Sequence, residues 1–370
     1  MAAGALAIAG AVHGAEEPPL ASLAPEGWHI GVAVNPSHTS GRNAAEQAIV
    51  IRHFDSITNE NALKWERVHP EPDRYDFTES DDFVAFGEKH GMFIVGHVLL
   101  WHQQTPAWVF EGRDGRPLDR DTALTRLRTH IEAVVGRYRG RVHAWDVVNE
   151  ALEEDGTMRR TPWREAIGDD FVARAFEFAH KADPDAELYY NDYNIWNPAK
   201  RAGALRLIRQ LRDQGLRVDA LGAQGHWLLE TPALRDIEGI FTDAKAAGLK
   251  VAITELDVDV LPREARMHGA DLAMRAKMRE ETNIYADGLP DDVQQRLAAR
   301  YADIFGIFLR HRQTLGRVTF WGVTDGHSWL NNFPVPGRVN YPLLWDRQGR
   351  PKAAFHAVVK VLQGAKEVGE

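Results

Sequence analysis

The chain has 370 residues, of which 44% are hydrophobic and 26% are charged, and its formal net charge is −9 at pH 7. This composition is typical of a globular protein, and the absence of a basic tract argues against nucleic acid as a partner. The sequence contains no cysteine, which excludes disulfides and thiolate metal sites. No segment reaches the roughly 18 apolar residues of a membrane span, so we expect no membrane partner.

The N-terminus, MAAGALAIAGAVHGAEEPPL, combines a run of small apolar residues with an acidic break that contains proline. This pattern resembles the hydrophobic region and cleavage zone of a secretory signal peptide, although no Lys or Arg precedes the run. We therefore predict that residues 1–24 are a signal-peptide remnant or a disordered segment, and that the protein is secreted or periplasmic. Residues 25–365 show no linker and no shift in composition, which predicts a single domain.

From there on, short apolar runs alternate with amphipathic stretches. The apolar runs occupy residues 28–35, 55–61, 93–102, 142–150, 187–194, 220–227, 250–259 and 317–329. Continuous runs of aliphatic and aromatic residues are typical of parallel strands that are buried on both faces. Helical periodicity is clear at 119–140, which ends in Gly140, at 231–248, which begins with a Thr-Pro cap signal, and at 291–311.

Eight strand candidates that alternate with about eight helices predict an α/β fold, a single (β/α)8 or TIM barrel. A doubly wound open sheet is the alternative. However, no Gly-rich phosphate loop follows any of the strands, which argues against that alternative and against a nucleotide cofactor. We therefore expect no cofactor. In a TIM barrel the active site lies at the C-terminal ends of the strands.

Polar and aromatic side chains gather at those predicted strand ends. They are Glu60, Asn61, His97, Trp101, His102, Asn149, Glu150, Asn191, Asp192, Gln224, His226, Glu255, Asp257, Trp321 and Asp325. The set offers carboxylates, amides, imidazoles and indoles, but no nucleophilic Ser elbow. A metal site built from His97, His102 and Asp325 is a weaker alternative, because the sequence has no HxH pair and no HExxH helix, and we expect no metal.

Two of these carboxylates suit glycoside hydrolysis. Glu150 ends the fourth predicted strand and Glu255 lies near the end of the seventh, on roughly opposite sides of the ring. The reaction needs one carboxyl group to protonate the leaving oxygen and another to attack or stabilise the anomeric carbon. Two carboxyl groups in one cleft ionise at different pH values, so one can stay charged while the other keeps a proton. Trp101, Trp321 and Trp329 are candidates to stack on sugar rings.

The motifs WDVVNEA at 145–151 and ITELDV at 253–258 resemble the acid/base and nucleophile signatures of glycoside hydrolase family 10, the endo-β-1,4-xylanases. ITNENALKWERVHPEPDRYDF, GHVLLWH, YYNDYN, GAQGHW and RVTFWGVTDGHSWLNNFP resemble that family too, in its order. The resemblance spans roughly residues 25–362. It implies that the domain at 25–365 is a catalytic barrel that hydrolyses internal bonds of xylan with retention, through a covalent glycosyl-enzyme intermediate.

Carried over residue by residue, the resemblance implies that Glu150 is the general acid/base and Glu255 the nucleophile. It implies that Asn149 hydrogen-bonds the sugar 2-hydroxyl, and that His226, backed by Asp257, holds the nucleophile. The residues implied to line the cleft are Glu60, Asn61, Lys64, His97, Trp101 and Gln224, with Trp321 and Trp329 as its aromatic walls. His102 and Asp192 are expected to support the residues that line the cleft without contacting the sugar themselves.

The chain departs from the family pattern at a few positions. Leu330 stands where many relatives carry Arg, which puts a polar contact to the sugar in doubt there, and Trp345 stands where Phe is frequent. The long connection 261–290 is expected to shape the rim of the cleft. We expect xylan and xylo-oligosaccharides as partners and a monomeric chain. The alternatives are another β-1,4-glucan as substrate, or a non-catalytic barrel that only binds polysaccharide or protein.

Overall fold

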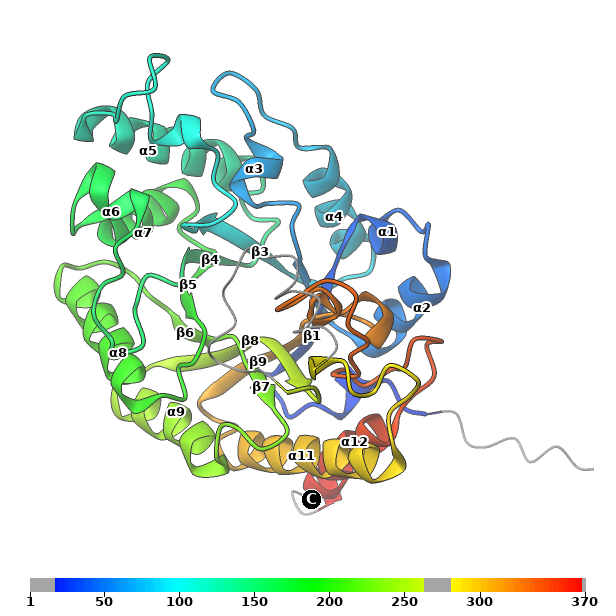
Figure 1. Cartoon of the computed structure of the whole chain (residues 1–370). Coiled ribbons are helices and arrows are strands. Elements are labelled where there is room, and N and C mark those ends of the chain that lie inside the picture. Colours follow the sequence, from blue (N-terminus) through cyan, green and yellow to red (C-terminus); the bar gives the residue numbers. More distant parts are fainter. Residues whose placement is uncertain (1–16, 263–280, 368–370) are drawn as a thin grey trace, which may run out of the picture.

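The computed structural model describes residues 17–262 and 281–367, and it shows a closed barrel of parallel strands (Figure 1). The strands of the ring are β1 (His29–Val34), β2 (Ser56–Asn59), β3 (Phe93–Leu100), β4 (Ala144–Asn149), β5 (Glu187–Asp192), β6 (Ala220–Ala223), β8 (Lys250–Asp259) and β9 (Leu315–Phe320). Each strand pairs with the next, and the pairings of β6 with β8 and of β9 with β1 close the ring. The predicted (β/α)8 barrel is confirmed, and the open sheet is excluded.

Helices form the outer layer around this ring (Figure 1). They are α1 (Pro36–Thr39), α2 (Ala44–His53), α3 (Trp65–Val68), α4 (Thr78–Lys89), α5 (Arg120–Arg137), α6 (Pro162–Ile167), α7 (Phe171–Ala182), α8 (Pro198–Asp213), α9 (Leu234–Ala246), α11 (Asp291–Arg310) and α12 (Ala353–Glu367). In α5 the predicted apolar face, with Leu127, Ile131 and Val134, is buried against the barrel. None of the helices among the described residues is both long and apolar enough to cross a bilayer.

Two predicted strands, 220–227 and 317–329, end well before the predicted residue, at Ala223 and Phe320. The run at 220–227 breaks after β6, because Gly225 adopts a φ of +87° that favours glycine, and a short strand β7 (His226–Leu228) follows. β7 pairs with the far end of β8, which places His226 beside Asp257. The run at 317–329 leaves the ring after Phe320 and continues as two short 3-10 turns, η3 (Asp325–His327) and η4 (Trp329–Asn331).

Two smaller expectations are corrected. Helix α9 starts at Leu234, and its N-cap residue Ala233 makes no side-chain cap, so the Thr-Pro signal does not begin the helix. The barrel starts before residue 25, because the turn η1 (Leu20–Leu23) packs on α12 and buries Leu20 completely. The signal-peptide prediction for residues 1–16, and most of the connection 261–290, lie outside the described residues.

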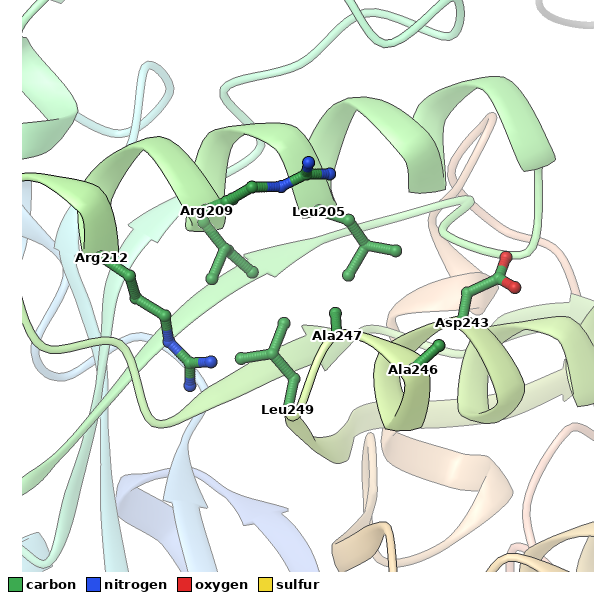
Figure 2. Close-up of a pocket in the computed structure, with 8 residues that line it drawn as sticks. Leu205, Arg209, Arg212, Asp243, Ala246, Ala247 and Leu249 are labelled. Carbon is green, nitrogen blue, oxygen red and sulfur yellow. The ribbon is translucent and has the colours of Figure 1, made fainter.

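A groove also runs along the outer surface, between α8 and α9 (Figure 2). Its volume is about 550 Å³, and Leu205, Ile208 and Leu249 line it together with Arg209, Arg212 and Asp243. The lining holds one carboxylate and no aromatic ring, so it lacks the pair of acids that glycoside hydrolysis requires. This groove is therefore not the predicted catalytic cleft, which we expect at the C-terminal ends of the barrel strands.

Candidate active site

Glu150 directly follows β4 in a constrained backbone position. Its φ is +59°, a left-handed conformation that is uncommon for a residue with a side chain and costs of the order of 1 kcal/mol. Its backbone N–H donates to Asn191 O (2.9 Å). The carboxylate accepts hydrogen bonds from Trp101 Nε1 (2.9 Å) and from Gln224 Nε2 (3.0 Å). Donors from the ends of β3 and β6 therefore hold this carboxylate in one orientation.

Glu255 projects from β8 and is only 5% exposed. Its Oε1 accepts from Asn191 Nδ2 (2.9 Å), and its Oε2 lies 3.1 Å from His226 Nε2. Burial raises the pKa of Glu255, but the hydrogen bond from His226, the charges of His97 and His226 and the Asn191 amide outweigh it and hold the pKa below its usual value. Glu255 is therefore ionised at neutral pH, as a nucleophile must be.

His226 lies between two carboxylates. Its Nε2 faces Glu255, and its Nδ1 lies 3.0 Å from Asp257 Oδ2, which also accepts a hydrogen bond from Trp329 Nε1 (2.8 Å). Burial lowers the pKa of His226, but Asp257 and then Glu255 outweigh it and raise the pKa to about 9. The imidazolium therefore persists at neutral pH and keeps Glu255 charged and oriented.

This pKa shift predicts how stability depends on pH. A group whose pKa rises on folding, here from 6.5 to about 9, contributes its full stabilisation below pH 6.5 and loses it as the pH passes 9. We expect the free energy of unfolding to fall by on the order of 3 kcal/mol more in the wild type than in His226→Asn between pH 6 and pH 10. Chemical denaturation at several pH values measures this difference, and parallel curves for the two proteins would contradict it.

An amide network joins the two glutamates. Gln224 Nε2, which donates to Glu150, lies 3.3 Å from Asn149 Oδ1, and Asn191 Nδ2 donates to the same Oδ1 (3.0 Å) as well as to Glu255. Asn191 is oriented in turn by the Thr254 hydroxyl (2.6 Å). Glu150 and Glu255 are therefore linked through three buried amides at one end of the barrel.

Asn191 stands at a predicted strand end but has no predicted role, and Thr254 is not among the predicted site residues. The position of Asn191 at the end of its strand is the signal that could have assigned it to the site. Nothing in the sequence distinguishes Thr254, because its importance comes from the Asn191 amide that it contacts.

Residues predicted to line the cleft surround this network. Lys64 Nζ donates to Asn61 Oδ1 (3.1 Å) and lies 5.0 Å from the centre of the Trp101 ring. Burial lowers the pKa of Lys64, against the opposing charges of Glu255, Glu60 and Glu150. Lys64 therefore lies within electrostatic reach of both acids.

His97 approaches from β3 and connects to the aromatic wall. Its Nδ1 lies 2.9 Å from Asp146 Oδ2, a buried partner that sequence reasoning missed, and its ring meets Trp321 edge-on at 5.3 Å. Trp329 lies next to His226, with their ring centres 4.9 Å apart. Both predicted wall residues, Trp321 and Trp329, therefore contact the histidines that flank Glu255.

The predicted supporting residues have different surroundings. Asp192 pairs with Lys200 (2.9 Å) and accepts from Tyr190 (2.6 Å), and burial raises its pKa to about 6 despite Lys200. Burial lowers the pKa of His102, against the charge of Glu150, so its imidazole is neutral at neutral pH. Both lie behind Glu150, within electrostatic reach of its carboxylate.

Two other residues turn out to be structural. Asp325 is buried and paired with Lys352 (2.8 Å), while His97 pairs with Asp146, so the alternative metal site from His97, His102 and Asp325 does not assemble. Leu330 is 0% exposed, so its side chain is buried in the interior.

A parallel barrel with two hydrogen-bonded glutamates, amide donors and indoles at the C-terminal ends of its strands is the arrangement of a glycoside hydrolase. The family model for glycosyl hydrolase family 10 matches residues 20–361. The chain belongs to this family, and the resemblance inferred from the motifs is confirmed.

Relatives named as xylanases are similar to this chain over nearly its whole length. The endo-1,4-beta-xylanase A of Xylanibacter ruminicola is 41% identical, covering 90% of this chain and 90% of that protein. The endo-1,4-beta-xylanase of Geobacillus stearothermophilus is 40% identical, covering 93% and 98%. A GH10 endoxylanase retrieved from a sugarcane soil metagenome has a solved structure that superposes with a TM-score of 0.88 at 39% identity, covering 94% of this chain and 100% of that one.

Proposed function

We propose that this protein is a retaining endo-β-1,4-xylanase that acts on xylan and xylo-oligosaccharides. The observation that carries the proposal is the pairing of an ionised Glu255, held by His226 and Asn191, with Glu150 in one amide network. The names of the relatives support xylan as the substrate. So does a similar solved structure, of a mutant in complex with xylotriose, which matches at 35% identity with a TM-score of 0.83.

In the first step Glu255 attacks the anomeric carbon while Glu150 protonates the leaving oxygen. Asn149 lies between the two acids, where its amide can bind the 2-hydroxyl as charge develops on the sugar. The product of this step is a glycosyl ester on Glu255.

In the second step the deprotonated Glu150 takes a proton from water as this water attacks the anomeric carbon from the side that the leaving group vacated. The bond between that carbon and Glu255 breaks, which returns Glu255 to a carboxylate and leaves Glu150 protonated for the next cycle. Esterification removes the negative charge of Glu255, so Glu150 no longer faces an anion when it acts as base. Two inversions at one carbon restore the original configuration.

An uncharged polymer gives little long-range electrostatic attraction, so binding rests on hydrogen bonds and on ring stacking. Trp321 and Trp329 supply apolar faces beside the nucleophile, and Lys64 with Asn61 supplies polar groups within electrostatic reach of both acids. We expect all of these residues to contribute to the affinity for xylan.

The stereochemistry is tested by following fresh hydrolysis of xylotetraose by proton NMR. We expect the β-anomer of the new reducing end to appear first and the α-anomer to grow in later by mutarotation. Initial release of the α-anomer would contradict retention. Rates on xylan, cellulose-type and mannan polymers distinguish a xylanase from an enzyme for another β-1,4-glucan, and absence of reducing sugar from all of them would favour a non-catalytic barrel.

Export to the periplasm or the medium is part of the same proposal, and it rests on the N-terminal sequence alone. N-terminal sequencing of protein recovered from each cell fraction tests it. The monomeric state is likewise a prediction, which light scattering of the purified chain measures.

A further inference from the structure

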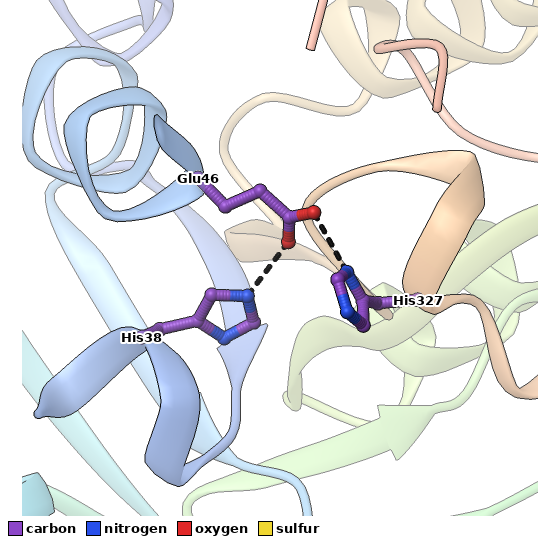
Figure 3. Close-up of side chains that lie close together, drawn as sticks. All are labelled: His38, Glu46 and His327. Atoms are coloured by element: carbon purple, nitrogen blue, oxygen red, sulfur yellow. Dashed lines mark hydrogen bonds and ion pairs between the residues drawn. The ribbon is translucent and has the colours of Figure 1, made fainter. Parts of the chain in front are cut away.

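Glu46, on α2, is buried beneath two loops and belongs to no part of the proposed catalytic site. Its Oε2 lies 2.7 Å from His38 Nε2, and its Oε1 lies 2.7 Å from His327 Nδ1 (Figure 3). The Thr324 hydroxyl donates to the same Oε1 (2.9 Å). His38 follows β1, whereas Thr324 and His327 follow β9, so Glu46 joins the first and last loops where the ring closes.

Two imidazoles and a carboxylate can also be metal ligands, and their ligand atoms lie within 4.8 Å of one another. The hydrogen bonds argue against a metal here. The Asn35 backbone N–H donates to His38 Nδ1 (3.1 Å), so the proton of a neutral His38 is on Nε2, the atom that faces Glu46. A ligating imidazole needs a lone pair on that atom and donates through its other nitrogen.

Glu46 is therefore a hydrogen-bond acceptor that stays charged. Burial raises its pKa, but the hydrogen bonds from His38 and Thr324 and the charge of His327 outweigh it and lower the pKa to about 2. A carboxylate that is ionised at every working pH can hold its three donors throughout that range.

The loop that Glu46 holds leads to the nucleophile. Trp329 comes two residues after His327, and its indole N–H donates to Asp257 (2.8 Å). Asp257 lies 3.0 Å from His226, which in turn lies 3.1 Å from Glu255. Polar contacts, interrupted only by this short turn of chain, therefore connect Glu46 with Glu255.

The same loop has a second anchor on its inner side. Asp325 accepts from the backbone N–H of Leu343 (2.8 Å) and from Lys352 (2.8 Å). These contacts of Asp325 remain when Glu46 or His327 is replaced. Such variants should therefore keep the loop folded but lose the contacts that hold its outer side to Glu46.

We propose that Glu46 is a positioning residue, which sets the place of the loop 324–331 through Thr324 and His327, and so fixes Trp329 against the nucleophile. This inference rests on the proposed role of Glu255. It assigns to a residue outside the cleft a share in the rate of glycosyl transfer.

The first test uses His327, whose side chain is 47% exposed, so that its replacement should not prevent folding. We expect kcat on xylotetraose to fall about 10-fold in His327→Ala and in Glu46→Gln, with a smaller change in KM, because a displaced nucleophile slows the chemical step. His327→Gln keeps a donor for Glu46 and should recover most of the rate. Glu238→Gln, which removes another His–Glu contact (to His311, 3.2 Å) on the outer helices, should leave kcat unchanged.

A double-mutant cycle tests the route through the indole. Trp329→Phe removes the hydrogen bond to Asp257. In that background His327→Ala should lower kcat by less than about twofold, because the Trp329–Asp257 hydrogen bond that transmits its effect is already absent. Independent, multiplying effects would overturn the positioning role while leaving the proposed nucleophile untouched. Failure of the proposed catalytic mechanism would have a different sign: the Glu255→Gln variant would still hydrolyse xylotetraose.

A metal site at His38, Glu46 and His327 would be detected by thermal denaturation of the same variants with Zn²⁺. If equimolar Zn²⁺ raised the Tm of the wild type but not of His327→Ala, the cluster would be a metal site, and the proposed positioning role of Glu46 would be wrong. Unchanged Tm values with Zn²⁺, together with the loss of kcat, support the hydrogen-bonded arrangement.

Discussion

Glu255→Gln should abolish turnover of xylan, with kcat lower by at least about 10,000-fold, because an amide neither carries the charge nor forms the ester that the first step requires. The substitution keeps the shape of the side chain, and an amide oxygen can still accept a hydrogen bond from Asn191. A large loss with a wild-type Tm therefore reports on chemistry. Steady-state rates on xylotetraose and thermal denaturation measure the two quantities.

A matched control and a chemical rescue sharpen this prediction. Glu230→Gln removes a surface carboxylate that pairs with Arg296 (2.6 Å), and it should leave kcat unchanged. In Glu255→Gly, azide can enter the space of the missing carboxylate and attack an activated aryl xylobioside from that side, giving the α-xylobiosyl azide. A β-azide, or residual wild-type turnover in Glu255→Gln, would remove Glu255 from the role of nucleophile.

Glu150→Ala should separate substrates by their leaving groups. On xylan we expect kcat to fall by roughly 1,000-fold, because the leaving sugar oxygen must be protonated as the bond breaks. The dinitrophenolate of a dinitrophenyl xylobioside leaves without needing a proton, so the first step on this substrate should slow by less than about 10-fold. The second step still lacks its base, and the glycosyl-enzyme should accumulate.

Stopped-flow release of dinitrophenolate measures this difference as a burst followed by slow turnover. Azide, a nucleophile that needs no base, should speed the slow phase and give the β-azide. Equal losses on xylan and on the aryl substrate would mean that Glu150 is not the proton donor. Trp101→Phe serves as a comparison, since it removes one hydrogen bond to Glu150 (2.9 Å) and keeps the carboxylate.

Much of the fold follows from local pattern. Buried parallel strands are continuous apolar runs and their covering helices are amphipathic, so their alternation marks a barrel before any contact is known. The same reasoning placed Glu150 and Glu255 at one end of the ring, since parallel strands share the direction of their C-termini. The apolar pattern does not predict the break of the strand at Gly225, because the pattern of 220–227 continues through a turn that one glycine makes possible.

The contacts that adjust the site are less accessible from sequence. Asn191 matters because its amide reaches both Asn149 and Glu255, and Glu46 because it meets His327, which is 281 positions away along the chain. Such contacts depend on how neighbouring loops pack at the mouth of the barrel. A single sequence carries no periodic signal for that packing.

For this protein the sequence by itself predicted the barrel and placed Glu150 and Glu255 at strand ends, because the period of burial and the residue at each strand end are local properties of the chain. The family came from the likeness of its motifs to known members. The tertiary structure alone decided that His226 is held as a cation between Asp257 and Glu255, and that three amides connect the two acids. These states depend on burial and on distances between separate strands, which exist only once the ring has closed.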